Sequence, residues 1–321
     1  MTAAAGEITV CSEEWAELGE GVRWDPAARE LIWVDILAGI VRRASVGDDM
    51  LHTTATWTMP RPVGAVTPAA GGGLVLATGT GFSALDAYGR ETWLATAEPG
   101  AEAKLRMNDG ACDPAGRFLA GTMAYDTQEG AGTLWCLDVD GSVRPLLRGL
   151  TISNGLGWSP DGRTFYLADS GPATVEAFAY DVTSGTLTER RRLFALPDGE
   201  GAPDGLCVDV EGCLWVAVWG GAELRRYSPD GDLLDRIEVP VSQPTSVCLG
   251  SPTMDQLFVA TATHRLSEDA LVRQPLAGRM LRTPVKVAGM PITPYAGPIP
   301  ALDPPADRPG PFMARSTGRR G

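Results

Sequence analysis

Short apolar runs alternate with polar turns along most of the chain. The runs at 30–35 (ELIWVD), 74–78 (LVLAT) and 164–168 (TFYLA) are rich in β-branched, aromatic or other apolar residues, which favours strands. Turn residues precede them, as in Ser159-Pro160-Asp161-Gly162, where proline presets the first corner and glycine accepts a positive φ. The pattern predicts an all-β chain with almost no helix.

The strand-and-turn unit recurs six times. Its turns begin at Asp25, Thr67, Asp113, Ser159, Asp209 and Ser251, at intervals of 42 to 50 residues. A second hairpin follows each of them, as in TLWCLDVDGSV (133–143). Two hairpins per repeat give four strands, and this period is typical of a propeller blade. We therefore predict a six-bladed β-propeller with blades that begin near residues 19, 61, 106, 152, 202 and 243.

The two ends of the chain have different predicted roles. The segment EITVC (7–11) reads as a strand that completes the last blade and closes the ring. From about Met290 the strand pattern stops and prolines accumulate, followed by a basic end. Such a composition cannot form a sheet or a core. We predict a propeller domain over 1–298 and a poorly ordered tail over 299–321.

Charge and composition exclude some partners. The formal net charge is −13, with 44% hydrophobic and 21% charged residues. An acidic chain lacks the basic footprint that nucleic acids and anionic membranes require. No stretch approaches the roughly 20 apolar residues of a membrane helix, and the start, MTAAAGEITV, does not read as a signal peptide. We expect a cytoplasmic protein with its six cysteines reduced, as a monomer or weak homo-oligomer.

Polar residues recur at one register of the repeat. Asn154 lies five residues before its turn, and the same position holds Glu20, Asn108 and Asp204 in three other repeats. The two remaining repeats offer Pro62 and Ser246. The innermost strands of a propeller begin here, so we expect these side chains to converge at one mouth of the central channel. Aligning the third repeat on its glycine would select Asp109 instead of Asn108.

This convergence predicts a cation site. Two carboxylates and two amides are hard oxygen donors, which suit a divalent ion such as calcium, magnesium or manganese. The alternative is that these residues only form turns and cap backbone groups. Other chemistries find less support, because His52 and His264 lack metal-ligand spacing and no nucleophile elbow is present.

Four stretches carry a resemblance to a known family: LGEGVRW, RMNDGACDPAGRFLAGTM, ISNGLGWSPDGRTFYLADS and APDGLCVDVEGCLWVAVWGG. They resemble the senescence-marker-protein/gluconolactonase/luciferin-regenerating-enzyme family, and the resemblance runs from about Glu13 to Gly297. It implies a six-bladed propeller with one divalent ion held by Glu20, Asn154 and Asp204. It also implies that Arg106 and Asn108 hold substrate hydroxyls, with a further substrate carboxylate near Asp126 in GTMAYD.

The resemblance implies a metal-dependent lactonase that acts on a small sugar-acid lactone of the aldonolactone type. Asp204 would also act as general base on the attacking water. The metal could be calcium, zinc, manganese, magnesium or iron, since its identity does not transfer between family members. A hydrophobic mouth would favour other lactones or phosphotriesters instead. A non-catalytic calcium-binding propeller would not need Arg106 and Asn108.

Overall fold

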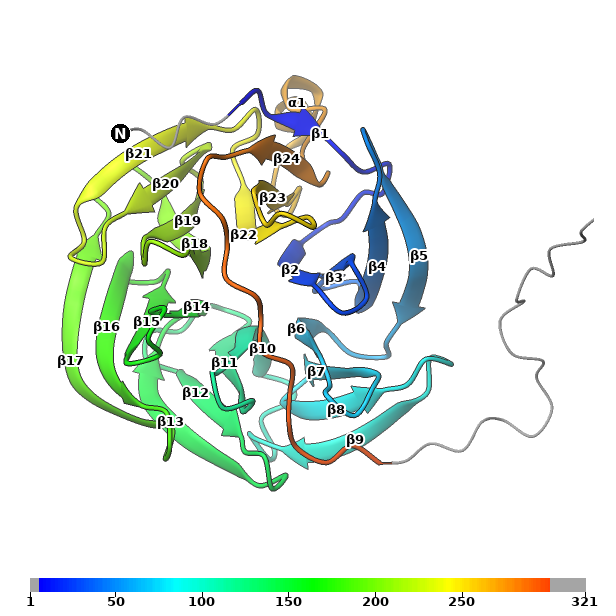
Figure 1. Cartoon of the computed structure of the whole chain (residues 1–321), viewed down its shortest axis with the longest axis vertical. Coiled ribbons are helices and arrows are strands. Elements are labelled where there is room, and N and C mark those ends of the chain that lie inside the picture. The colour runs from blue at the N-terminus through cyan, green and yellow to red at the C-terminus, as the bar shows by residue number, and fades with distance from the viewer. Residues whose placement is uncertain (1–5, 301–321) are drawn as a thin grey trace, which may run out of the picture.

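The computed structural model describes residues 6–300, which form six four-stranded antiparallel sheets arranged as blades around a central axis (Figure 1). Blade one contains β2 (Gly19–Asp25), β3 (Glu30–Asp35), β4 (Ile40–Val46) and β5 (Leu51–Thr58). Blade two contains β6 (Val63–Pro68), β7 (Leu74–Thr78), β8 (Gly81–Leu85) and β9 (Glu91–Thr96). Blade three contains β10 (Leu105–Cys112), β11 (Phe118–Ala124), β12 (Gly132–Leu137) and β13 (Val143–Leu150).

The second half of the ring repeats this order. Blade four contains β14 (Ser153–Trp158), β15 (Thr164–Asp169), β16 (Thr174–Asp181) and β17 (Thr186–Ala195). Blade five contains β18 (Ala202–Val208), β19 (Leu214–Trp219), β20 (Glu223–Tyr227) and β21 (Leu233–Glu238). Blade six contains β22 (Pro244–Gly250), β23 (Gln256–Thr261), β24 (Leu281–Pro284) and β1 (Thr9–Val10). The six predicted blade starts each lie within two residues of an innermost strand, which confirms the propeller.

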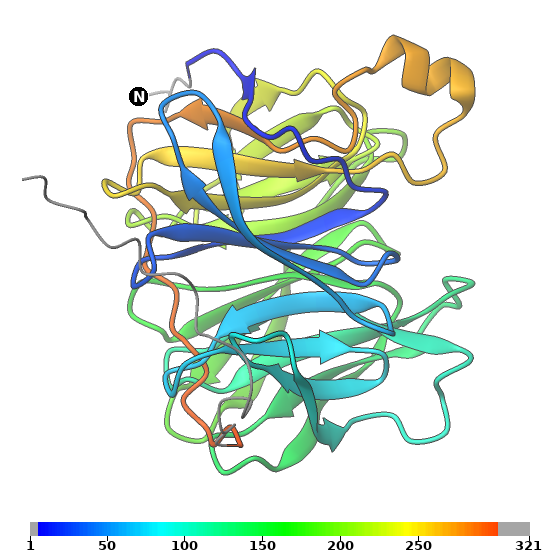
Figure 2. The ribbon, with the colours of Figure 1, turned by 90° about the vertical axis from the view of Figure 1, so that its right-hand side faces the viewer.

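The last blade is completed by the N-terminal strand, as predicted. In β1, Thr9 pairs with Arg282 and Val10 with Leu281 of β24. Since the first and last parts of the chain share one sheet, the ring is closed and the edge of β24 is covered. The one helix of the described residues, α1 (Glu268–Arg273), projects from the loop between β23 and β24 (Figure 2). No helix within 6–300 has the length and apolarity to cross a bilayer.

The core lies between the blades. The middle strands are buried on both faces, because each sheet packs against the sheets before and after it; all five residues of β7 and of β8 are buried. Phe82 of blade two and Phe118 of blade three meet edge to face, with ring centroids 5.7 Å apart. The outermost strands are partly exposed, and β17 is polar along most of its length.

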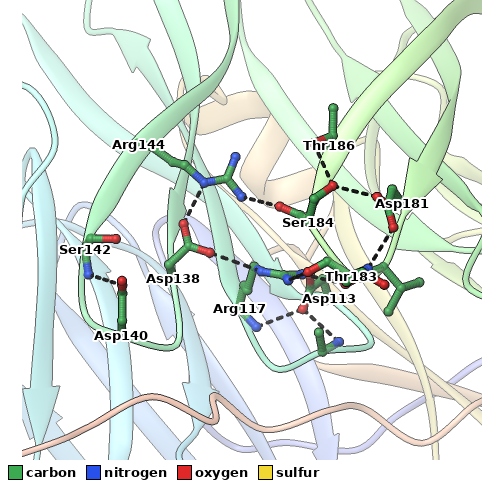
Figure 3. A network of polar contacts seen from close by, with 12 residues as sticks. Asp113, Arg117, Asp138, Asp140, Ser142, Arg144, Asp181, Thr183, Ser184 and Thr186 are labelled. Atoms are coloured by element: carbon green, nitrogen blue, oxygen red, sulfur yellow. Dashed lines mark hydrogen bonds and ion pairs between the residues drawn. The ribbon is translucent and has the colours of Figure 1, made fainter.

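Polar contacts at the turns also join neighbouring blades, as Figure 3 shows for blades three and four. Asp113 is fully buried and accepts bonds from the Arg117 guanidinium (2.6 Å) and from the hydroxyl of Tyr180. Arg117 also donates to the carbonyls of Val182 (2.9 Å) and Thr183 (2.5 Å), across the blade boundary. One arginine therefore neutralises a buried carboxylate of blade three and binds backbone carbonyls of blade four.

The innermost strands share an irregularity that places the site. In every blade the pairing between the first and second strands shifts register near the start of the first strand. A β-bulge of this kind breaks the in-and-out alternation and re-aims side chains. The shifts lie between Glu20 and Arg23, Val63 and Ala65, Met107 and Gly110, Ser153 and Leu156, Pro203 and Leu206, and Pro244 and Ser246. The residues predicted to converge therefore lie within or beside the bulges.

Glycines in these bulges let adjacent innermost strands approach each other. A Cβ atom on Gly155 would lie 2.5 Å from the carbonyl oxygen of Asp204, and one on Gly64 would lie 2.0 Å from that of Asn108. Neither distance is compatible with a side chain, so these positions require glycine. The close approach brings polar residues of successive blades to the same level of the axis.

The two mouths of the channel differ. After β24 the chain crosses one face of the ring over the axis, drawn orange to red in Figure 1. This segment pairs with blade five through Gly289 and Asp209, and with blade two through Tyr295 and Ala69. Figure 2 shows it on the face opposite α1. Of the predicted tail, only residues 299 and 300 are described, and the rest lies outside the described residues.

Candidate functional site

One cavity occupies the mouth at which the innermost strands begin, on the face of α1. Its volume is about 420 Å³. Five of the six predicted site residues line it, namely Glu20, Arg106, Asn108, Asn154 and Asp204. They come from β2, β10, β14 and β18, four different blades. All five are buried, with exposed fractions of 4% to 6%, so the floor of the cavity is polar although it is largely removed from bulk water.

The two carboxylates at this floor destabilise each other's ionised form. Burial, and after it the charge of nearby Asp109, raises the pKa of Glu20 from 4.5 to about 8. Burial also raises the pKa of Asp204 well above its usual range, and the Glu20 carboxylate contributes next. Two buried carboxylates that repel each other favour either a bound proton or a bound cation.

Asn154 is held with its oxygen free. Its amide nitrogen Nδ2 donates to Oγ of Ser170 (2.9 Å), and that hydroxyl donates to the carbonyl of Pro203 (2.7 Å). The amide oxygen Oδ1 of Asn154 is buried with no hydrogen-bond partner among the described residues, and the same holds for Oδ1 of Asp204. Buried acceptors without a donor are costly, so each marks a place where a cation or a ligand donor fits.

These atoms fit a divalent metal. Within residues 6–300 no group of three His, Cys, Asp or Glu side chains could hold an ion. The predicted set contains only two such residues, Glu20 and Asp204, and its third donor is the amide oxygen of Asn154. Two carboxylates and a neutral oxygen form an all-oxygen set, which suits hard divalent cations.

Arg106 and Asn108 form a second polar unit beside the carboxylates. Nη1 of Arg106 donates to Oδ1 of Asn108 (2.7 Å), and Nδ2 of Asn108 donates to the carbonyl of Ser153 in the next blade (2.9 Å). Burial lowers the pKa of Arg106 to about 10, although the charges of Glu20 and other neighbours oppose this shift. The guanidinium therefore remains cationic at neutral pH. Its Nη1 also donates to the carbonyl of Met107 (3.0 Å), so the N–H groups of Nε and Nη2 are the ones that would bind a ligand.

Asp109 does not line the cavity that Asn108 lines, although both residues lie in the same bulge. Its carboxylate accepts bonds from the amide of Gly110 (2.7 Å) and from Nη2 of Arg23 (3.3 Å). Arg23 lines a cavity at the other mouth, and Asp109 does not line the cavity of Asn108. Asp109 thus acts on the site through its charge, which raises the pKa of Glu20 and Asp204.

Asp126 is the predicted site residue that the structure does not bring to the cavity. It is exposed, and its carboxylate accepts a bond from the amide of Gln128 (3.2 Å) in its own loop. The neighbouring Tyr125 and Thr127 do line the cavity. Because β11 ends at Ala124, strand alternation does not extend to this loop, and a resemblance in sequence cannot fix which of its side chains points inward.

Other lining residues were not singled out from the sequence. They include Leu37, Trp219, Gln243, His264 and Arg265, which lie in loops or at strand ends. The register of the innermost strands gives no signal for them. Nδ1 of His264 lies 3.2 Å from the Glu17 carboxylate.

Comparison with known proteins shows to which family the chain belongs. The sequence profile of the SMP-30/Gluconolactonase/LRE-like region matches residues 18–263. Regucalcin from Danio rerio is 37% identical over 289 residues, which cover 89% of this chain and 97% of the relative. The chain belongs to the SMP-30/gluconolactonase/LRE-like family. This confirms the resemblance on which the site prediction partly rested.

Solved structures of this family have the same fold. A calcium-binding protein, regucalcin from Agrobacterium tumefaciens, superposes with a TM-score of 0.83 at 28% identity, over 89% of this chain and 96% of the other. A luciferin-regenerating enzyme superposes with a TM-score of 0.81, also at 28% identity, over 89% and 97%. The propeller therefore extends over nearly the whole length of these relatives.

The buried carboxylates predict a pH dependence of the metal-free protein. A pKa raised on folding means that the folded state binds its proton more tightly, so the free energy of unfolding falls as pH rises from about 4.5 towards 8. We expect the Tm of chelator-treated wild type to fall relative to that of Glu20→Gln over this range. The difference between the free energies of unfolding of the two proteins should change by at most about 1.4 kcal/mol per pH unit. If the Tm values of the two proteins change in parallel over this pH range, ionisation of Glu20 does not lower the stability of the folded protein.

Proposed function

We propose that the protein is a metal-dependent lactonase that hydrolyses a small lactone of the sugar-acid type to the open-chain hydroxy acid. The observation that carries the proposal is the floor of the cavity. There, two mutually repelling carboxylates and an unpaired amide oxygen adjoin a paired arginine and asparagine. Membership of a family whose name includes gluconolactonase supports the same activity.

Glu20, Asn154 and Asp204 would hold the metal. When bound, a divalent ion supplies Lewis-acid stabilisation of the negative charge that develops on the lactone carbonyl oxygen. A related solved structure is described as a calcium-binding protein, and an all-oxygen set suits calcium, magnesium or manganese. Zinc and iron remain candidates for the experiment below.

Residues of this chain would carry out proton transfer and substrate binding. Asp204 would take a proton from water as the water oxygen attacks the carbonyl carbon, and the ring C–O bond then breaks. The proton returns to the leaving alkoxide, which becomes the hydroxyl of the product. Arg106 and Asn108 would orient ring hydroxyls. Asp126 does not line the cavity, so no contact with the substrate is assigned to it.

Loss of the arginine should weaken substrate binding more than catalysis. Arg106 contacts bound groups in both the ground state and the transition state, so Arg106→Ala should raise KM more than it lowers kcat. Hydrogen bonds from a charged donor are worth about 1.5–3 kcal/mol, which corresponds to roughly tenfold to hundredfold in KM. Asn108→Ala should act in the same direction but more mildly, since a neutral bond contributes about 0.5–1.5 kcal/mol.

Steady-state kinetics and metal titration of both variants test this division. Arg163→Ala is the matched control, because Arg163 is exposed and does not line the cavity. Metal affinity should barely change in any of the three. Release of the metal by Arg106→Ala would contradict the separation of metal-holding and hydroxyl-binding groups.

A pH-stat screen tests the activity itself. The protein would be treated with a chelator, offered a panel of lactones, and supplied with calcium, zinc, manganese, magnesium or iron one at a time. We expect no enzymatic ring opening without metal and restored hydrolysis with at least one ion. Hydrolysis that chelation does not affect, or its absence with every metal and lactone, would overturn the proposal.

A further inference from the structure

Arg265 is the second arginine that lines the cavity, besides Arg106. It lies in the loop between β23 and α1, it is exposed, and its side chain forms no hydrogen bond or ion pair with another of the described residues. The neighbouring His264 differs, because its Nδ1 lies 3.2 Å from the Glu17 carboxylate. Arg265 therefore presents a positive charge at the mouth that is paired with no carboxylate of residues 6–300.

Backbone contacts fix the position of Arg265. The amide of Leu266 donates to the carbonyl of Thr263 (3.0 Å), which closes a tight turn with Arg265 as its third residue. The amide of Thr263 donates in turn to the carbonyl of Glu17 (3.0 Å), at the entry to blade one. The guanidinium is thus carried by a turn that is attached to the propeller, and it is not part of a free loop.

The turn itself does not require an arginine. Arg265 has a φ of 60°, and a turn with positive φ at its third residue favours glycine, because a Cβ atom is strained there. A residue other than glycine in such a conformation suggests a role beyond the local backbone. Because Arg265 lines the cavity and has no partner in the protein, contact with a ligand is the role that fits.

The wall between the floor and the mouth offers acceptors to hydroxyl groups. Gln243, immediately before β22, is 8% exposed, and its amide oxygen Oε1 is buried without a hydrogen-bond partner among the described residues. Thr127 and Ser170 also line the cavity. Each of their hydroxyls already donates to a backbone carbonyl at 2.7 Å, which leaves its oxygen as an acceptor. These contacts suit a ligand with several hydroxyls.

The charges of the lining side chains favour an anionic ligand when a metal is bound. The carboxylates of Glu20 and Asp204 balance the guanidinium groups of Arg106 and Arg265, so these four charges cancel. A divalent ion at the floor would then leave two positive charges in excess, although the chain as a whole has a net charge of −13. A cavity of this sign raises the local concentration of anions.

We infer, on the basis of the proposed lactonase function, that the substrate is a sugar lactone that carries an anionic group, a carboxylate or a phosphate, at the end remote from the lactone carbonyl. The lactone group faces the floor, and Arg265 binds the anionic group at the mouth. Gln243 accepts a hydrogen bond from a hydroxyl between them. A guanidinium binds a carboxylate or a phosphate through two parallel hydrogen bonds, which a hydroxyl cannot accept. Hydrolysis opens the ring C–O bond as before and leaves the anionic group unchanged.

Two matched pairs of lactones test this substrate class. Glucaro-1,4-lactone has a carboxylate where glucono-1,4-lactone has a hydroxymethyl group, and 6-phosphoglucono-1,5-lactone is compared with glucono-1,5-lactone in the same way. For at least one pair, the ratio of kcat/KM for the anionic lactone to that for the neutral one should fall in Arg265→Gly. The expected fall is on the order of fivefold, the upper end for an exposed ion pair. The pair with the larger fall identifies the anion.

The glycine variant is chosen because the turn accepts it. Arg265→Gly removes the charge and relieves the positive φ, so its Tm should be at least that of the wild type. Arg265→Lys should retain part of the preference, because it keeps the charge but not the two parallel hydrogen bonds. Arg29→Gly is the matched control. Arg29 is also exposed, has a φ of 58° and does not line the cavity, so its loss should leave both ratios unchanged.

Binding to the metal-free protein separates this inference from the proposed function. Chelator-treated protein would be titrated calorimetrically with glucuronate, glucose 6-phosphate and glucose, none of which is a lactone. If no lactone is opened but an anionic sugar binds more tightly than glucose, and Arg265→Gly removes the difference, the activity is wrong and the anion site stands. If lactones are opened with the same ratios by the wild type and Arg265→Gly, the inference is wrong and the activity stands. If neither opening nor a difference in affinity is observed, both are wrong.

Discussion

Replacing Asp204 by asparagine should abolish lactone hydrolysis and metal binding while the propeller stays folded. The variant removes a ligand charge and the proposed general base together, and loss of such a base alone typically lowers rates about 10²–10⁴-fold. It also removes one of two buried carboxylates that repel each other, so the metal-free variant should be at least as stable as metal-free wild type. Activity, metal content and Tm should be measured on the same preparations.

Stability is the readout that separates this role from a structural one. If Asp204 only held the fold together, Asp204→Asn would lower the Tm of the metal-free protein. The control is Glu129→Gln, which neutralises an exposed carboxylate in the loop after β11 and should change neither metal content nor hydrolysis. An Asp204→Asn protein that retains one metal per chain and wild-type rates would contradict the assignment.

Replacing Arg117 by alanine should lower the free energy of unfolding by about 3–5 kcal/mol, the usual cost of breaking a buried ion pair. Asp113, which is fully buried, would lose the guanidinium that neutralises it. The carbonyls of Val182 and Thr183 would lose their donor at the boundary between blades three and four (Figure 3). Urea unfolding of the variant measures the effect.

Arg144→Ala is the matched control in the same network. Arg144 pairs with Asp138 but is 36% exposed, so its loss should cost no more than about 1 kcal/mol. Adding Asp113→Asn to Arg117→Ala should recover part of the lost stability, since it removes the uncompensated buried charge. Equal effects of Arg117→Ala and Arg144→Ala would show that burial of the pair does not matter.

The fold could be predicted because the turns that mark each repeat recur at a regular interval in the sequence. Asp113 and Asp209 each accept backbone amides within their own turn and bind an arginine, so the residue type that marks the repeat is also required by the structure. Closure of the ring by β1 could be predicted because the last repeat is too short to supply its own fourth strand. The bulges could not be predicted, because a strand pattern does not show where pairing shifts. They explain why both Asn108 and Asp109 fitted the register.

The site was predictable only as far as the innermost strands extend. Glu20, Asn154 and Asp204 occupy one register of a closed ring, so counting from the turns was sufficient to bring them together. Tyr125 and Trp219 lie where strands give way to loops, and the direction of a loop side chain depends on tertiary contacts that spacing does not encode. For this reason the sequence could not show that Tyr125 lines the cavity while Asp126, the next residue, does not.

Anomalous diffraction from crystals soaked with the activating metal tests most directly whether Glu20, Asn154 and Asp204 hold one catalytic ion. We expect one strong peak per chain, within bonding distance of the carboxylates of Glu20 and Asp204 and of Oδ1 of Asn154. Nδ2 of Asn154 should still donate to Ser170. A peak bound by other residues, or an active crystal form with no ion at this mouth, would contradict it.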